Sequence, residues 1–150
     1  MKKGKGKKAR IITPSLPGTI FVARTHDRGR GVFTNKKIKK GQVVEICPMI
    51  VFSQKDRKQI NDTFLYEYYF EWGDDVKKGA LALGYGSLYN HSYTPNAKYD
   101  PDFDLNILEF SAIRDIEAGE EITVNYNLDP NDTTPVWWDK QKIKNKKQHP

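Results

Sequence analysis

The sequence predicts a mostly β domain with one short helix, and three observations support this fold class. The chain has 150 residues, a typical length for a single domain with its own core. Its β-branched and aromatic residues occur in short runs, and Gly, Pro, Asn and Asp form frequent turns between these runs. Only the segment that follows Ser53 carries the start signal of a helix.

The first strands follow a basic tail. Residues 1–10 carry six basic and no acidic side chains and few apolar ones, so we expect residues 1–18 to form a disordered tail. Residues 19–25 are mainly β-branched and aromatic, which predicts a strand. A turn rich in Gly and Arg spans residues 27–31, and a second strand begins at Val32.

A longer strand and the helix come next. The strand is expected over residues 42–52, where Pro48 indicates a sheet edge or a bulge. Residues 53–56 form a capping-box pattern with Asp at its fourth position, and they start a helix over residues 54–65. Ile60 and Phe64 would share one face of that helix.

Five aromatic residues lie close together after the helix. Such a cluster is more typical of a core than of a binding wall, although a wall stays open as the alternative. The cluster consists of Tyr66, Tyr68, Tyr69, Phe70 and Trp72.

The second half predicts three more strands and an internal repeat. Strands are expected over residues 80–83, 105–113 and 121–126, followed by a turn-rich linker. Asp100, Asp102 and Asp104 resemble a calcium loop, but Leu105 and Ser111 stand where that loop needs Gly and Glu, so we expect a turn. Residues 38–44 match residues 116–122 in an Ile, a Gly and a final β-branched residue, which predicts two turns that each launch a strand.

Charge and cysteine content limit the function classes. The net charge is +6, and both ends are basic, so the part between them is mildly acidic and suits a basic peptide better than DNA. Cys47 is the only cysteine, which excludes an internal disulfide and a cysteine-cluster zinc site, and no metal site is predicted. No apolar run approaches the length of a membrane span and no secretory signal is visible, so an intracellular, reducing compartment is expected.

The polar loop over residues 86–97, G-S-L-Y-N-H-S-Y-T-P-N-A, is the strongest local signal of a site. Its short polar side chains prefer to bond local backbone, whereas Leu88, Tyr89 and Tyr93 provide apolar anchors. A polar loop anchored by aromatic residues is a common place for a ligand site, and an ordinary irregular turn is the alternative.

Three motifs in series resemble the SET-domain protein-lysine methyltransferases. They are G-R-G at residues 29–31, N-H-S-Y-T-P-N at 90–96 and G-E-E-I-T-V-N-Y at 119–126. The resemblance covers residues 19–127 and is closest to minimal, free-standing viral and microbial forms. It implies a β-clip-like SET fold of small curved sheets with a C-terminal pseudoknot. Residues 128–150 would then be a post-SET-like segment and basic tail without zinc ligands.

The resemblance also implies a reaction and its residues. A methyl group passes from S-adenosylmethionine (SAM) to a lysine amine of a protein or peptide, which leaves S-adenosylhomocysteine. Tyr126 would be the catalytic residue. Many family members have Cys where this chain has Tyr93, and a Cys-rich tail that completes the channel, so Trp137 and Trp138 are the candidates to close it here. The implied cofactor-binding residues are Gly29, Arg30, Gly31, Asn90, His91 and Tyr126, and the candidate channel residues are Tyr85, Tyr69, Trp137 and Trp138.

Two other classes of protein stay open. One is a non-catalytic, SET-like binding module whose basic tails contact nucleic acid or an acidic partner. The other is a self-associating β protein that does not use SAM. A homodimer is compatible with all three hypotheses, whereas no membrane partner is expected, and the compartment would be cytoplasm, nucleoid or nucleus.

Overall fold

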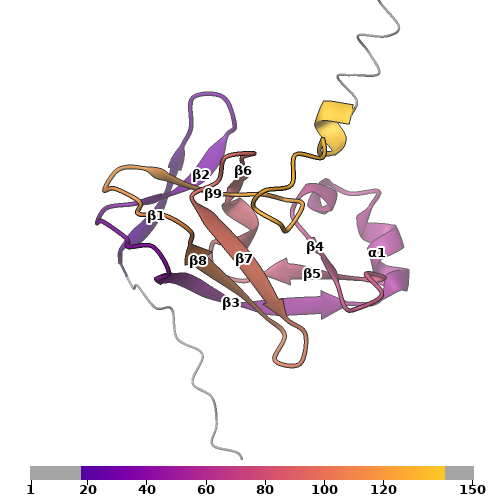
Figure 1. Ribbon diagram of the computed structural model, residues 1–150. Coiled ribbons are helices and arrows are strands. Elements are labelled where there is room, and N and C mark those ends of the chain that lie inside the picture. Colours follow the sequence, from indigo (N-terminus) through magenta and orange to yellow (C-terminus); the bar gives the residue numbers. More distant parts are fainter. Residues whose placement is uncertain (1–17, 141–150) are drawn as a thin grey trace, which may run out of the picture.

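The domain consists of two sheets with the short helix α1 at its edge, and residues 137–140 form a further helical turn (Figure 1). The computed structural model describes residues 18–140. The mostly β fold class is therefore confirmed. The predicted N-terminal tail, apart from residue 18, and the basic end of the chain lie outside the described residues, so the domain boundaries stay predictions.

Two separate sheets are formed by strands that are far apart in sequence. The four-stranded sheet has the order β1-β2-β9-β6, and the five-stranded sheet has the order β4-β5-β3-β8-β7. All strand pairs are antiparallel except β6 with β9. The strands are β1 (Ile20–Arg24), β2 (Arg30–Thr34), β3 (Val43–Phe52), β4 (Phe70–Trp72), β5 (Lys78–Ala82), β6 (Asn90–His91), β7 (Ala97–Asp102), β8 (Ile107–Ala112) and β9 (Glu121–Val124).

The internal repeat is confirmed as a pair of matching turns. Ile38 and Ile116 are both fully buried and exchange two backbone hydrogen bonds of 2.9 and 2.8 Å. Gly41 and Gly119 follow them at φ of 83° and 87°, a left-handed conformation that side chains oppose. Each turn leads into a strand, β3 in the first case and β9 in the second.

The helix is shorter than predicted. α1 spans Gln54–Ile60, and the Ser53 hydroxyl caps it by accepting a hydrogen bond from the Asp56 N–H. The predicted end at residue 65 is wrong because Asn61, Asp62 and Thr63 favour turns and caps. Thr63 instead caps a separate 3₁₀ helix, η1 (Phe64–Glu67). The predicted shared face of Ile60 and Phe64 is also wrong, since Phe64 lies in η1 rather than in α1 and is 74% exposed.

The aromatic cluster divides between core and surface. Trp72 is buried, and Phe70 packs against the core from β4. Tyr66 is exposed, so the expectation of core packing holds for only part of the cluster. Cys47 lies in the core, and burial raises the pKa of its thiol.

The strand β7 has no counterpart among the sequence predictions. It pairs with β8 along its whole length, and Asp100 lies within it rather than in a turn. The turn that follows is an Asx turn, in which the Asp102 carboxylate accepts hydrogen bonds from the N–H groups of Asp104 and Leu105. β8 therefore begins at Ile107 rather than at residue 105.

The strand β9 is inserted between two distant segments. It pairs with β2 on one side and with β6 on the other. The buried Asn96 side chain extends this pairing, because its amide donates to the Glu121 carbonyl at 2.8 Å and its oxygen accepts from the Thr123 N–H at 2.9 Å. The chain after β9 thus emerges beside residues 90–96, the arrangement expected for the pseudoknot (Figure 1).

We predict that Asn96→Ala lowers the free energy of unfolding by about 2 to 4 kcal/mol, because it leaves the part-buried Glu121 carbonyl and Thr123 N–H of β9 without these partners. Urea denaturation measures this change, and Asn131→Ala, at an exposed position, is the control with an expected change below about 0.5 kcal/mol. Equal stability of the two variants would show that Asn96 does not hold β9 in place.

Candidate active site

A cleft of about 1220 Å³ brings together the predicted site segments. Its walls come from the β1–β2 turn, residues 86–91, the insert over residues 66–72, residues 126–128 and the pair Trp137 and Trp138. Most of the residues predicted from the sequence line it. These are Gly29, Arg30, Tyr69, Asn90, His91, Tyr126, Trp137 and Trp138.

Two predicted residues do not line the cleft. Gly31 lies behind it, where a Cβ atom would collide with the Glu121 carboxylate and come within 3.0 Å of the Asn90 amide nitrogen. A side chain at this position would therefore force the bonded pair of Glu121 and Asn90 to move. Tyr85 is partly buried against the core, and its backbone N–H donates to the Glu45 carboxylate at 2.9 Å.

Tyr126 follows the end of β9 and presents its hydroxyl to the loop. The hydroxyl donates a hydrogen bond of 2.6 Å to the Tyr89 carbonyl. Although 39% of the residue is exposed, burial of the hydroxyl raises its pKa to about 12. Tyr126 is therefore a neutral phenol near pH 7, which can donate a hydrogen bond but does not act as a base.

Glu121 connects the three motif segments. Its carboxylate accepts a hydrogen bond of 2.7 Å from the Asn90 amide and forms a 2.6 Å ion pair with Arg28. Arg28 also donates to the His91 carbonyl at 3.1 Å, and Asn90 donates to the Arg30 carbonyl at 2.9 Å. Sequence reasoning missed Arg28 and Glu121 as site residues. The sequence did offer a clue to both residues, since Arg28 precedes the motif at residues 29–31 and Glu121 lies within the motif at residues 119–126.

A buried carboxylate supports the loop from inside the domain. Glu45, 6% exposed on β3, accepts hydrogen bonds from the Tyr85 N–H and, at 2.7 Å, from the Tyr89 hydroxyl. The Tyr89 ring stacks on Phe110 at 4.2 Å. Because the Tyr89 carbonyl receives the Tyr126 hydroxyl, Glu45 acts on the site through Tyr89. A lone Glu within an apolar strand was the signal for this role in the sequence.

The insert contributes tyrosines with different environments. The Tyr69 hydroxyl is already engaged, since it accepts from Arg57 at 3.0 Å and donates to Asn61 at 2.6 Å. Tyr69 therefore has no free hydroxyl proton to donate to a ligand in the cleft. Tyr68, which sequence reasoning did not select, also lines the cleft and lies close enough to Tyr126 to disfavour ionisation of that phenol.

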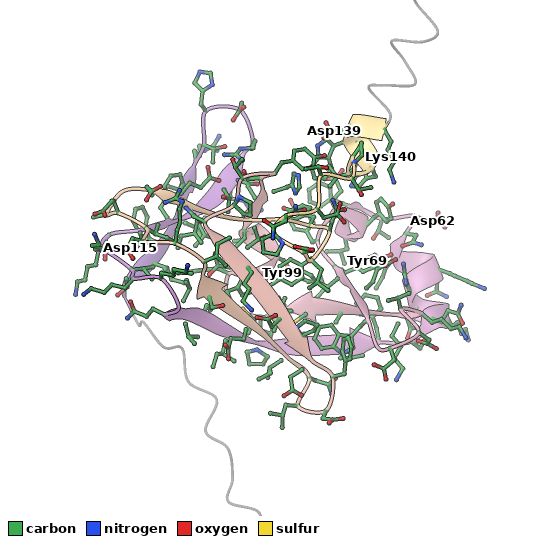
Figure 2. The ribbon with its side chains drawn as sticks, in the orientation of Figure 1. Asp62, Tyr69, Tyr99, Asp115, Asp139 and Lys140 are labelled. Carbon is green, nitrogen blue, oxygen red and sulfur yellow. The ribbon has the colours of Figure 1, made fainter. Side chains whose placement is uncertain are left out.

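The segment after residue 135 lies over the site. The Tyr93 hydroxyl accepts from the Val136 N–H at 3.1 Å and donates to the Asp139 carboxylate at 2.8 Å. Trp138 packs edge-on against His91 and Tyr126, with ring centroids 5.8 and 5.7 Å apart. Figure 2 shows Asp139 at the helical turn of this segment, on the side of the domain that also carries Tyr69.

Residues 18–140 contain no group of three or more His, Cys, Asp or Glu side chains that could hold a metal ion. In the same part of the chain, no helix is long and apolar enough to cross a membrane.

Comparison with known proteins gives concordant matches. The SET domain family model matches residues 29–127. The chain is 32% identical over 114 residues to the H3 lysine-37 specific histone-lysine N-methyltransferase of Schizosaccharomyces pombe, which covers 75% of this chain and 76% of that protein. It is also 29% identical over 120 residues to the protein-lysine N-trimethyltransferase SMYD5 of Mus musculus, covering 77% of this chain and 28% of that protein.

Two further matches extend the comparison. Identity to the histone-lysine N-methyltransferase SUV39H1 of Xenopus laevis is 34% over 142 residues, covering 82% of this chain and 33% of that longer protein. Among solved structures, a Plasmodium falciparum protein described as a candidate histone methyltransferase superposes with a TM-score of 0.56 at 28% identity. That match covers 79% of this chain and 99% of the Plasmodium chain.

Proposed function

This chain belongs to the SET-domain family and is a protein-lysine methyltransferase, and from that premise we propose how its own residues hold SAM and present a lysine. SET-domain methyltransferases use SAM as the methyl donor. The observation that carries the proposal is that the β1–β2 turn, residues 90–91 and Tyr126 line one cleft. The alternative of a non-catalytic binding module is not favoured, because the relatives are named as methyltransferases.

The groups around the cleft fit the charges of SAM. Arg24 and Arg30 line it and offer guanidinium groups to the carboxylate of the cofactor. The Asn90 amide oxygen would face its ammonium group, while the Glu121 carboxylate, which does not line the cleft, holds the Asn90 amide nitrogen. The Ser87 hydroxyl is buried in the cleft wall without a hydrogen-bond partner among residues 18–140, so it is available to a bound ligand. Gly29 and His91 would contribute through their backbone, whereas Gly31 would act through its close packing against Glu121 and Asn90.

Bound SAM supplies an electrophilic methyl group on a positively charged sulfur. The substrate amine must be neutral to react, whereas a free lysine has a pKa of about 10.4. The rings of Tyr68, Phe70 and Trp138 provide apolar walls in the cleft, which would disfavour the ammonium form. The chain's contribution is therefore to exclude water and to align the amine.

Tyr126 would orient the reacting groups through its neutral hydroxyl. The Tyr89 carbonyl already fixes the direction of this hydroxyl. Because burial raises its pKa to about 12, the phenol keeps its proton over the working pH range. We therefore assign the proton lost by lysine to solvent rather than to Tyr126.

The segment of Trp137 and Trp138 would close the channel without a metal. Tyr93 stands where many family members have a zinc-ligating Cys, and it instead holds this segment through Val136 and Asp139. Trp138 then covers His91 and Tyr126, and Trp137 packs on Tyr66 of the insert. Tyr69 and Tyr85 stay the less direct candidates for the channel wall.

The proposed substrate is a basic, lysine-containing protein segment. Relatives named for histone lysines support this class, and Glu67 lines the cleft as an acidic group. An intracellular compartment, nuclear or cytoplasmic, follows from such substrates. Contact of the basic tails with nucleic acid and formation of a homodimer stay predictions, since the tails lie outside the described residues.

We predict that Tyr126→Phe lowers kcat about 100-fold or more, because it removes the oriented hydroxyl while SAM binding persists. Transfer of a labelled methyl group to core histones and to a lysine-rich peptide measures the rate. The same exchange at Tyr66, whose hydroxyl makes no hydrogen bond within residues 18–140, is the matched control and is expected to cost far less. Wild-type rates for Tyr126→Phe, or no transfer by a folded wild-type protein that binds SAM, would reject the proposal.

We predict that Tyr93→Phe raises KM for the peptide about tenfold, because the phenyl ring cannot hold Val136 and Asp139. Asp139→Asn keeps an acceptor oxygen for the Tyr93 hydroxyl and should give a smaller rise. Steady-state kinetics at saturating SAM measure both variants. An unchanged KM in Tyr93→Phe would mean that the Tyr93 hydroxyl does not control channel closure.

A further inference from the structure

The imidazole of His91 contacts the backbone of Tyr126. Its Nδ1 atom accepts a hydrogen bond of 3.1 Å from the Tyr126 N–H. An acceptor nitrogen must carry a lone pair, so Nδ1 is unprotonated in this arrangement. The remaining proton of the neutral ring therefore lies on Nε2.

This contact continues the pairing of β6 with β9. Asn90 and His91 lie opposite Thr123 and Val124, and the Ser92 N–H donates to the Val124 carbonyl at 2.9 Å. The backbone ladder ends at that point, before Tyr126. The His91 side chain takes the place of the next backbone acceptor.

The surroundings of the ring favour its neutral form. Nε2 is buried and has no hydrogen-bond partner among residues 18–140. The ring packs edge-on against Tyr93, Tyr126 and Trp138, with centroids 4.3, 5.3 and 5.8 Å apart. Aromatic faces attract an N–H group only weakly and do not compensate a buried positive charge as a carboxylate would.

The charged groups near the ring oppose one another. Arg28, bound to the His91 carbonyl and paired with Glu121, disfavours protonation, whereas Asp139 in the covering segment favours it. Tyr93 and Tyr126 are the other titratable neighbours, and both are neutral phenols whose pKa values are raised. Burial is the largest effect, so the pKa of His91 lies below its usual 6.5.

We propose that the neutral, Nε2-protonated imidazole of His91 is a positioning residue for Tyr126. Protonation places an Nδ1–H group against the Tyr126 N–H, and two donors cannot share that contact. The Tyr126 backbone then moves away, and the hydroxyl leaves the Tyr89 carbonyl. This role adds to the proposed function, on which it rests for its catalytic meaning. It predicts that the rate of methyl transfer falls at acid pH as His91 becomes protonated.

The same proton equilibrium affects stability. The unfolded chain binds this proton at a higher pH than the folded chain, since the folded pKa is lowered. The contribution of neutral His91 is complete above about pH 6.5 and is lost as the pH falls through the folded pKa.

The decisive experiment is ¹⁵N NMR of the imidazole nitrogens across pH in the full chain without ligand. The chain has three histidines, so His26→Gln and His149→Gln variants assign the signals. We expect His91 to show the Nε2–H tautomer, a pKa below 6.5 and a Tyr126 amide that loses protection from exchange as His91 is protonated. The proposal would be overturned by an Nδ1–H tautomer, by a His91 pKa above 6.5, or by a Tyr126 amide whose protection from exchange does not change as His91 is protonated.

Methyl-transfer assays of two His91 variants test the catalytic part of the proposal. His91→Asn offers a non-titrating acceptor oxygen near the Nδ1 position, whereas His91→Ala offers none. We expect His91→Asn to keep kcat within about fivefold at pH 8 and to lose the extra fall in rate below pH 6.5, while His91→Ala falls about 30-fold or more. Equal losses in both variants would refute the positioning role. If the NMR result is as expected but wild type transfers no methyl group, the proposed function fails and the His91–Tyr126 contact stands.

Discussion

The insertion of β9 between β2 and residues 90–96 is the constraint on which the site depends. Neither flanking segment is near β9 in sequence, yet both bond to it, through two ladders and through the Asn96 side chain. This arrangement places Tyr126 beside His91 and aligns Glu121 with Arg28 and Asn90. A site assembled from three segments thus has a single strand at its centre, and anything that loosens this strand should disturb all three.

Two supports act on Tyr126 from opposite sides. From the core, Glu45 fixes Tyr89, whose carbonyl fixes the Tyr126 hydroxyl. From the surface, Trp138 covers the Tyr126 ring in a segment that Tyr93 holds. Both supports use neutral phenols whose pKa values are raised by burial. The enclosure of the site is therefore made by aromatic packing and hydrogen bonds within residues 18–140, where zinc and thiolates serve in larger family members.

Short sequence patterns predicted the turns and the helix cap, because these features depend on neighbouring residues alone. The turns at Gly41 and Gly119 and the capping of α1 by Ser53 were found from short stretches of sequence. Asn90 and Tyr126 were selected by resemblance to a family, and both line the cleft, while their roles stay predictions. The roles of Glu45 and Glu121 were not found, because each depends on partners that only the sheet order brings near. The end of α1 was missed for a local reason, since apolar spacing suggested a continuous helix across residues that prefer turns. Resemblance to a known family predicted the threaded arrangement of β9, which general rules of strand order would not have produced.

Calorimetric titration of SAM into the wild-type protein and into Asn90→Ala tests most directly whether these segments form one cofactor site. The account predicts saturable binding with a micromolar Kd, about −8 kcal/mol, and a loss of about tenfold or more in Asn90→Ala. Asn131→Ala, at an exposed position away from the cleft lining, should bind as wild type does. Wild-type affinity in a folded Asn90→Ala variant, or no binding by a folded wild-type protein with or without a lysine peptide, would contradict it.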